Sequence, residues 1–295
     1  MPPSIQLRSF VVGCPRSGTT LLQSFLAAHP DVASFPESGF FTDLFGRQDW
    51  RMHGRRHASA WREWRGEWAL RLGLAHRRSA WAHHRLTKFL ENTGRVDLLK
   101  GIPEEARRAS VLGRRFITVL DRMALDAGKH AWLEKTPSNL NYIDCILRIL
   151  PSARFVNILR DGADSVASLH DMGRRFPDKW WKQFLDIDLC IAMWNRSVQS
   201  TRRFRHHPAH MLVRYDDLVT STEAVLRDIC RFLGLEYSTH MIENRGQANR
   251  PLVMSKEPWK AEASQPLTLH KGEKFERLFD AEQQKHIQSR LERLD

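Results

Sequence analysis

The sequence is short of cysteine and has no long hydrophobic run. Its 295 residues include four cysteines, none in a CxxC or other spacing typical of a metal site. We therefore expect buried thiols of a protein made in a reducing compartment. No 18 consecutive apolar residues occur and the first ten residues lack an apolar core, so the sequence predicts neither a transmembrane helix nor a signal peptide. These absences favour a soluble cytoplasmic protein.

Acidic residues are also too few to balance the basic ones. The chain has 46 Lys and Arg against 34 Asp and Glu, a formal net charge of +12, with the excess between residues 47 and 85 and again at 202–207. Such a balance favours anionic partners, whether nucleic acid, anionic lipid or a small polyanion. No zinc spacing, RNP aromatic pattern or clear recognition helix accompanies it. A basic nucleic-acid-binding protein is therefore kept only as an alternative.

Strand and helix patterns alternate along the chain. Runs of β-branched and apolar residues predict strands at 7–13, 154–159 and 211–215. Helical patterns follow them at 17–28, 163–170 and 222–233. This alternation indicates an α/β fold with a central parallel sheet flanked by helices. We predict one domain over residues 1–295, in which 47–130 and 171–207 are mainly helical.

A glycine-containing loop joins the first predicted strand to the first predicted helix. Its sequence is Gly13-Cys14-Pro15-Arg16-Ser17-Gly18-Thr19-Thr20. A loop that enters a helix N-terminus presents unpaired N–H groups and the positive end of the helix dipole, which favours an anion. The spacing of Gly13 and Gly18 matches the P-loop frame, and the hydroxyls of Ser17, Thr19 and Thr20 add further donors. The loop is a candidate phosphate site.

Two departures distinguish this loop from that of a nucleoside triphosphatase. The Lys that should follow Gly18 is replaced by Thr19, and the cation Arg16 lies inside the loop. The strand at 154–159 is followed by Arg160, where a metal-binding acid would be expected. Cations at both strand ends can hold a polyanion without metal. A P-loop-type kinase of unusual sequence therefore stays as the second alternative.

At these residues the chain resembles the family of sulfotransferases that use 3′-phosphoadenosine-5′-phosphosulfate (PAPS). The run from Pro15 to Leu22 is similar to the family's 5′-phosphosulfate-binding loop, in the form with Arg at the third loop position. The resemblance implies that Cys14, Pro15, Arg16, Ser17, Gly18, Thr19 and Thr20 bind the cofactor end that carries the sulfuryl group. It also implies a single P-loop-type domain with a helical lid insertion.

A second segment resembles the 3′-phosphate site of the same family. Residues 155–169 follow the family's pattern of strand, Arg-Asp-Pro and helix, with Gly162 where Pro is usual. Arg160 and Ser168 occupy the two ligand positions, and a guanidinium fork suits phosphate oxygens. By the same resemblance, Tyr215 would lie near the adenine and Lys274 would belong to a C-terminal segment over the 3′-phosphate, with Phe275 where Trp is usual.

The catalytic base separates two branches of the family. One branch uses a His two residues after a Lys, but here Lys135 is followed by Thr136 and Pro137. The other branch, with protein-tyrosine and several bacterial sulfotransferases, uses a Glu after the first helix, and Glu37 occupies that position. We expect apolar neighbours (Phe35, Phe40 and Phe41) to raise the pKa of Glu37 toward neutrality. Lys135 would stabilise charge on the bridging oxygen, and the alternative is a structural Lys at a helix N-terminus. His83 and His84 are the alternatives to Glu37 as the base.

The reaction implied is metal-independent, in-line transfer from PAPS to a hydroxyl acceptor, with 3′-phosphoadenosine 5′-phosphate (PAP) as product. Five tryptophans precede Lys135: Trp50, Trp61, Trp64, Trp68 and Trp81. Trp61, Trp64 and Trp68 are spaced at i, i+3 and i+7, so they would share one face of a helix. Such a face is typical of core packing or of a lid over an aromatic-lined acceptor pocket. The nearby arginines suit a small-molecule or glycan acceptor, including an anionic one. The sequence identifies neither the acceptor nor the oligomeric state.

Overall fold

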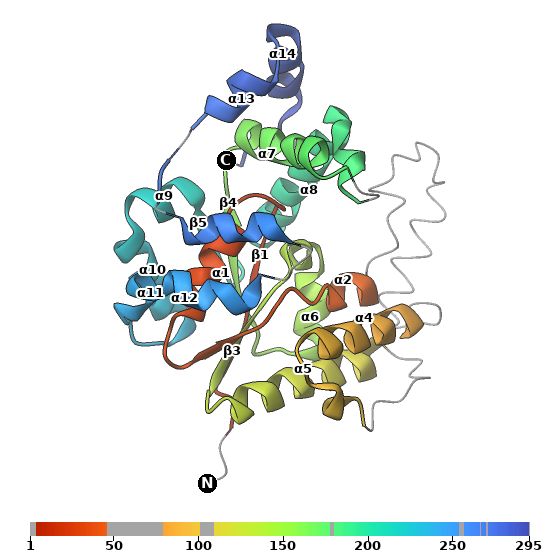
Figure 1. Ribbon diagram of the computed structural model, residues 1–295, viewed down its shortest axis with the longest axis vertical. Coiled ribbons are helices and arrows are strands. Elements are labelled where there is room, and N and C mark those ends of the chain that lie inside the picture. Colours follow the sequence, from red (N-terminus) through yellow and green to blue (C-terminus); the bar gives the residue numbers. More distant parts are fainter. Residues whose placement is uncertain are drawn as a thin grey trace.

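The computed structural model describes residues 4–45, 79–100, 109–177, 180–253, 257–265, 267–269 and 271–294. Within these residues a sheet of five parallel strands forms the centre of the molecule (Figure 1). Its order is β2-β3-β1-β4-β5. The strands are β1 (Leu7–Gly13), β2 (Val32–Ser34), β3 (Ala131–Lys135), β4 (Arg154–Leu159) and β5 (His210–Arg214).

Both faces of the sheet are buried, as its parallel strands require. In β1, Phe10 and Val11 are wholly inaccessible and belong to different apolar clusters, because successive side chains point to opposite faces. Phe10 stacks on Phe155 of β4 with 5.1 Å between ring centroids, and Val11 joins Val156 in the second cluster. β1 and β4 are inner strands covered on both faces, which explains why most of their residues are apolar.

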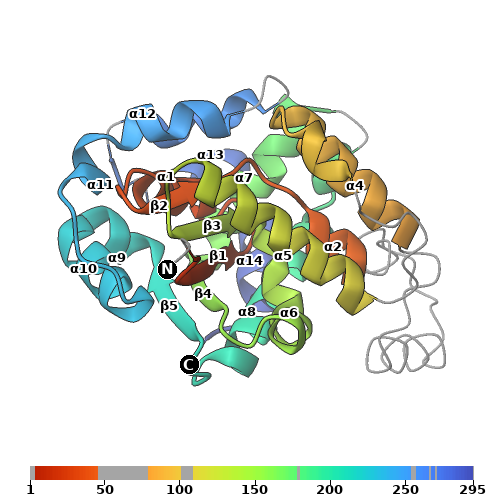
Figure 2. The same cartoon turned by 90° about the horizontal axis from the view of Figure 1, so that it is seen from below.

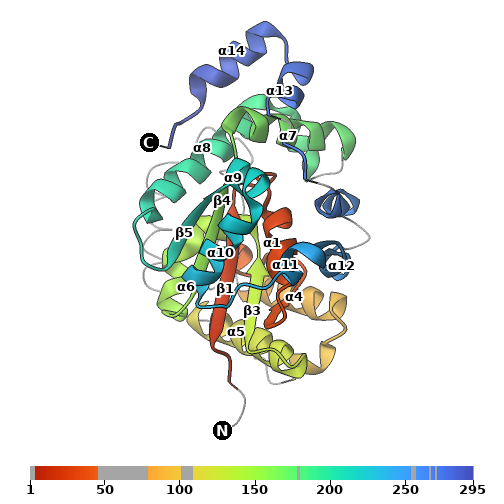
Figure 3. The same cartoon turned by 90° about the vertical axis from the view of Figure 1, so that its left-hand side faces the viewer.

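Helices cover the two faces and the carboxyl end of the sheet (Figures 1, 2 and 3). One face carries α2 (Phe40–Phe45), α4 (Ser79–Asn92), α5 (Ala109–Asp126) and α6 (Ile143–Ile149). The other carries α1 (Thr19–Ala27), α9 (Tyr215–Thr220), α10 (Thr222–Leu233), α11 (His240–Glu243) and α12 (Arg245–Asn249). At the carboxyl end lie α7 (Gly162–Arg175), α8 (Ile187–Phe204), α13 (Glu273–Leu278) and α14 (Ala281–Arg290). Short 3-10 turns are η1 (Val96–Leu99), η2 (Pro137–Tyr142), η3 (Trp181–Leu185), η4 (Arg250–Leu252) and η5 (Pro258–Ser264).

The topology places a crevice at the carboxyl ends of β1 and β4. These strands are neighbours, but α1 leads from β1 toward β2 on one side, whereas α7 and α8 lead from β4 to β5 on the other. Ligands of open α/β sheets bind at such a reversal of strand order. The loops that follow β1 and β4 are those that carry the two predicted phosphate sites.

The predicted α/β class and parallel sheet are confirmed, with two omissions. Strands at 7–13 and 154–159 and the helix at 222–233 have the predicted bounds. Strands β2 and β3 were not predicted, and Lys135 ends β3. The alternative that Lys135 lies beside a helix start is confirmed as a placement, because Thr136 is the N-cap of the 3-10 turn η2, which begins at Pro137. All four cysteines are free and buried. Trp50, Trp61, Trp64 and Trp68 lie outside the described residues, and no helix among the described ones is long and apolar enough to cross a membrane.

Candidate active site

The loop after β1 has an unusual backbone. Arg16 has φ +72°, the one non-glycine residue with positive φ among those described, and Gly18 at the start of α1 has φ +99°. A left-handed conformation costs a non-glycine residue about 1–2 kcal/mol. The surrounding turn supports it, since the N–H of Ser17 donates to the carbonyl of Cys14 at 3.1 Å. Strain of this kind concentrates at binding sites.

Two predicted loop residues, Cys14 and Ser17, have buried side chains that contact the protein interior. The Ser17 hydroxyl is buried, 2.7 Å from the carbonyl oxygen of Cys14 and 3.0 Å from that of Ile158 in β4. The expectation that it adds a donor to the phosphate site is therefore wrong; it fastens the loop to the neighbouring strand. The Cys14 side chain is buried in the apolar cluster under α7 and α8, and burial raises the pKa of its thiol to about 12.

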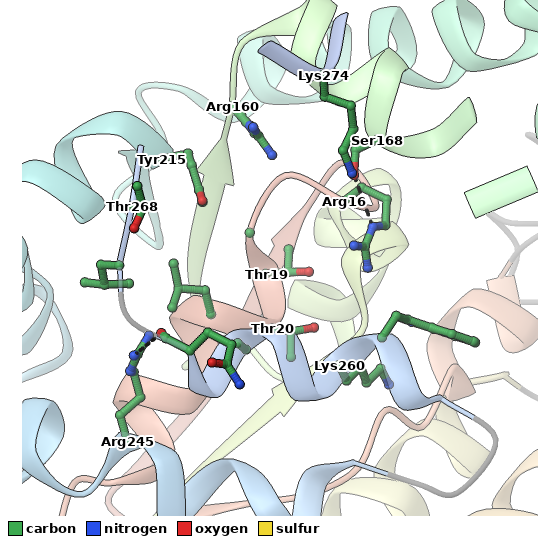
Figure 4. A pocket seen from close by; sticks show the side chains of 16 residues that line it. Arg16, Thr19, Thr20, Arg160, Ser168, Tyr215, Arg245, Lys260, Thr268 and Lys274 are labelled. Atoms are coloured by element: carbon green, nitrogen blue, oxygen red, sulfur yellow. Dashed lines mark hydrogen bonds between the residues drawn. The ribbon is translucent and has the colours of Figure 1, made fainter. Parts of the chain in front are cut away.

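A cavity of about 590 Å³ lies above this loop (Figure 4). It brings together most of the predicted binding residues: Arg16, Gly18, Thr19, Thr20, Arg160, Ser168, Tyr215 and Lys274. Cys14, Pro15 and Ser17 do not line it. The two segments that were predicted to bind the two phosphate ends of one cofactor thus form the walls of one cavity, as the adjacency of β1 and β4 requires.

Arg160 and Tyr215 are packed together at one end of the cavity. The Arg160 guanidinium carbon lies 4.7 Å from the centroid of the Tyr215 ring. A Cβ atom at Gly18 would lie 2.5 Å from this ring, so the close contact requires glycine. The Nε of Arg160 is buried and has no hydrogen-bond partner among the described residues, and its Nη2 is 3.5 Å from Asp164. A buried N–H group without a hydrogen-bond partner is costly, so binding of an anion that accepts from it is favoured.

The C-terminal segment closes the same end. Asp164 of α7 is almost fully buried and accepts a hydrogen bond from the Gly272 N–H at 3.0 Å. Lys274 pairs with Asp171 of the same helix at 2.9 Å. Ser168, between these two acids, has its Oγ 3.4 Å from Nε of Arg16. Arg16, Ser168 and Lys274 therefore converge from three segments, and Figure 4 shows them along one wall.

A cluster of two buried lysines and two partly exposed carboxylates lies beside the loop. The Lys135 Nζ at the end of β3 is 2.5 Å from the Glu37 carboxylate, and only 2% of the Lys135 side chain is exposed. Lys260 of η5 lies 3.4 Å from Glu37 and 2.6 Å from Glu257. The pairing of β2 with β3 explains how Glu37, soon after β2, reaches Lys135. The structure thus brings together the two predicted catalytic residues, although neither lines the cavity itself.

The environment of Glu37 differs from the one expected. Burial alone would raise the pKa of Glu37, but the charges and hydrogen bonds of Lys135 and Lys260 outweigh burial and lower it to about 2. The expectation of a pKa near neutrality is therefore wrong. Phe35, Phe40 and Phe41 are core residues, and they do not outweigh the two ammonium groups. Glu37 is held firmly as a carboxylate.

A second acid lies under this cluster. Glu134 is wholly buried, and it accepts hydrogen bonds from the hydroxyls of Ser38 at 2.7 Å and Thr136 at 2.6 Å and from the amide of Asn139 at 2.9 Å. Burial raises the pKa of Glu134. These bonds tie the residues that follow Glu37 and Lys135 to the end of β3. The sequence did not predict this structural role of Glu134.

The alternative bases are not at the cavity. His83 and His84 lie on α4, partly or fully exposed, and neither lines the cavity. Trp81 belongs to the same helix, but its side chain is outside the part of the chain that the structure describes. The histidine alternatives are therefore less well placed than Glu37, which contacts the cavity residue Lys260.

Arg245, Trp259, Lys260 and Thr268 are among the lining residues that the sequence did not predict. The Arg245 guanidinium lies 5.1 Å from the Phe25 ring centroid and donates through Nη2 to the Gln265 carbonyl at 2.6 Å. Its Nη1 is buried without a hydrogen-bond partner among the described residues. No motif marks these residues, because the segments that carry them meet the loop only in the folded chain.

Comparison with known proteins gives a consistent result. The model of the sulfotransferase family matches residues 9–239. Protein-tyrosine sulfotransferase 1 of Danio rerio is 24% identical over 238 residues, covering 80% of this chain and 55% of that protein. Nodulation protein NoeE of Sinorhizobium fredii is 28% identical over 167 residues, covering 56% of this chain and 31% of that protein. The chain thus spans about half the length, or less, of these two curated relatives.

Solved structures share the fold. The sulfotransferase domain of a Synechococcus olefin synthase has a TM-score of 0.52 and 20% identity, covering 97% of this chain and 94% of that domain. A mouse sulfotransferase solved in complex with PAP has a TM-score of 0.51 and 13% identity, covering 96% of this chain and 81% of that one. At these identities the likeness concerns the architecture alone.

Proposed function

Because the chain belongs to the sulfotransferase family, we propose that it transfers the sulfuryl group of PAPS to a hydroxyl group of an acceptor, in line and without a metal ion. The observation that carries the proposal is the buried, unpartnered Nε of Arg160 in the cavity that also holds Ser168 and the loop after β1. The curated relatives include protein-tyrosine sulfotransferases, and the structural relatives include proteins solved with PAP.

The cavity fits a nucleotide with phosphate groups at two places. Arg160, Ser168 and Lys274 supply donors at one end, and the loop residues Thr19 and Thr20 lie at the start of α1. The first N–H groups of a helix are unpaired, so this loop suits the 5′-phosphosulfate and the Arg160 end suits the 3′-phosphate. A volume of about 590 Å³ lies within the range of sites for molecules of this size.

The adenine would lie between these ends. Tyr215 provides a ring face, and Arg245 and Thr268 line the same side of the cavity in Figure 4. The unpartnered Nη1 of Arg245 offers a donor to a ring nitrogen.

The residues near the loop divide the chemistry between them. Glu37 accepts the proton of the acceptor hydroxyl, whose oxygen forms a bond to sulfur as the bond from sulfur to the 5′-phosphate oxygen breaks. The phosphate leaves with the bonding electron pair as PAP. Arg16 stabilises the equatorial oxygens and Lys135 fixes Glu37 in place. Since arginines and lysines supply the positive charge at this edge of the sheet, we propose that transfer proceeds without metal.

The test is calorimetric titration with PAP in chelator-treated buffer, followed by ATP with Mg²⁺. We expect PAP to bind without metal and Arg160→Ala to weaken binding about 10-fold or more, because charge-assisted hydrogen bonds to the phosphate are lost. Arg148→Ala is the matched control, since Arg148 is an exposed arginine of α6 paired with Asp144. No PAP binding, or preferential binding of ATP with Mg²⁺, would replace this proposal with the kinase alternative.

A further inference from the structure

Lys260 belongs both to the cavity and to the charge cluster. It lines the cavity together with the loop residues, and in the view of Figure 4 it lies at the end opposite Arg160 and Lys274. Only 5% of the residue is exposed. Its Nζ is 2.6 Å from Glu257 and 3.4 Å from Glu37. Lys135 touches the same Glu37 but does not line the cavity.

The position of Lys260 is fixed by the fold. The buried side-chain amide of Asn249 in α12 donates to the Lys260 carbonyl at 3.1 Å and contacts the Ser264 hydroxyl at 3.0 Å. These bonds hold both ends of η5 against α12, and η5 also packs on α1, the helix that follows the phosphate loop. A flexible surface lysine has no such support. Lys260 is therefore held over the start of α1.

The charges around Lys260 balance one another before any ligand enters. Two ammonium groups, Lys135 and Lys260, face two carboxylates, Glu37 and Glu257. Glu134 lies beneath them, and burial favours its neutral form. At the other end of the cavity, the Nε of Arg160 has no hydrogen-bond partner among the described residues. At the Lys260 end, by contrast, an anion competes with Glu37 and Glu257 for the ammonium group.

Building on the function proposed above, we propose that Lys260 is a catalytic residue: it leaves Glu37 to bind the oxygens of the sulfuryl group, and this exchange frees Glu37 to accept the acceptor's proton. The proton passes from the acceptor hydroxyl to Glu37 while the acceptor oxygen bonds to sulfur. The bond from sulfur to the phosphate oxygen breaks, and its electron pair leaves with PAP. Lys260 keeps its own proton throughout.

The exchange explains how a strongly acidic Glu37 serves as a base. With Lys135 and Lys260 both near it, the pKa of Glu37 is about 2, too low for efficient proton acceptance near neutrality. Withdrawal of one ammonium group raises that pKa, because an opposite charge favours the carboxylate. The remaining charged neighbours are Lys135, Glu257 and Glu134. Glu257 and Glu134, when ionised, also raise the pKa of Glu37, because like charges disfavour its carboxylate. Glu37 therefore becomes a stronger base only when a sulfuryl group occupies Lys260.

Lys260→Met tests the proposal, since it removes the charge and keeps the length. We expect kcat to fall about 100-fold, the range for loss of one charge-stabilising donor. Binding of PAP, which has no sulfuryl group, should change less than about threefold. In the free protein the pKa of Glu37 should rise, so the acidic limb of the pH–rate profile moves to higher pH. Lys260→Arg should restore part of kcat, and Lys88→Met, at an exposed lysine of α4, should change nothing.

The outcomes separate this proposal from the function itself. If the wild-type protein neither binds PAP nor turns over PAPS, the proposed function fails. If the wild type is active and Lys260→Met keeps both its kcat and its pH profile, the role of Lys260 is refuted. Should Lys260→Met not fold, Glu257→Gln serves instead: without Glu257, Lys260 pairs more tightly with Glu37, so kcat should fall and the acidic limb should move to lower pH. Unchanged values in that variant would also refute the proposal.

Discussion

The guanidinium group of Arg160 lies over the ring of Tyr215, 4.7 Å from its centroid, and the same ring covers Gly18. This stack joins the carboxyl ends of β4 and β5 to the loop after β1. Gly18, Arg160 and Tyr215 are therefore packed against one another, although they belong to three different predicted parts of the site. A change in any of the three residues should alter the others.

Gly18→Ala should disrupt this packing. A Cβ at Gly18 would lie 2.5 Å from the Tyr215 ring, and φ of +99° is unfavourable for alanine. We expect PAP affinity to fall about 10-fold or more and the melting temperature to decrease. Calorimetry and thermal unfolding measure both. Gly234→Ala is the control, because Gly234 has a similar positive φ of +73° but open space around its Cβ, so it should lower stability and leave PAP binding unchanged.

Ser17→Ala and Ser168→Ala should have different effects. Ser17 fastens the loop to β4, so its loss should reduce the free energy of unfolding by about 1 kcal/mol, the net value of a buried hydrogen bond. Among the described residues, the hydroxyl of Ser168 has one hydrogen bond, a weak one of 3.4 Å from Arg16, so its loss should leave the unfolding free energy nearly unchanged while weakening PAP binding. Urea denaturation and PAP titration of both variants distinguish the roles. Equal losses of stability would contradict this division.

Glu37→Gln should remove turnover and a pH-dependent part of stability. The folded-state pKa of about 2 lies below the ordinary value of 4.5, so the carboxylate stabilises the fold above about pH 5 and this contribution is lost as the pH falls toward 2. The variant lacks it at every pH and leaves Lys135 buried without its partner. The difference in unfolding free energy should be largest near neutrality and shrink below about pH 4. Glu223→Gln, at an exposed helix pair, should show no such trend.

Arg245→Met should weaken nucleotide binding without changing the chemical step. Arg245 lines the cavity, and its buried Nη1 has no hydrogen-bond partner among the described residues. We expect PAP affinity to fall about 10-fold and kcat at saturating PAPS to stay within about twofold. Ribose 3′,5′-bisphosphate, which lacks the base, should bind both proteins equally. A similar loss for this compound would place Arg245 at a phosphate and not at the base.

The sequence predicted the central strands and the phosphate-binding elements because each is defined locally. β1 and β4 are continuous apolar runs, and the helix at 222–233 ends at Gly234 in the left-handed conformation. β3 was missed because it ends in Glu134 and Lys135, two charged residues that are buried. Their burial is satisfied by Ser38, Asn139 and Glu37, most of which are distant in sequence.

The environment of Glu37 was predicted wrongly for the same reason. Its neighbours in sequence are phenylalanines, which favour a raised pKa, but its neighbours in space are Lys135 and Lys260. Lys260 comes from a segment more than two hundred residues later in the chain, with no motif around it. A sequence pattern can place a carboxylate after a helix, whereas its acidity depends on which charges the whole fold brings near it.

The cavity draws its walls from opposite regions of the chain. Arg16 and Thr20 lie more than two hundred residues before Lys260 and Lys274 in the sequence. Gly272 is tied to Asp164, so the final wall can dock only on an α7 that is already formed. A folding intermediate in which this C-terminal wall is not yet docked has a phosphate loop but an incomplete cavity. Tight nucleotide binding therefore reports that segments far apart in the sequence have docked.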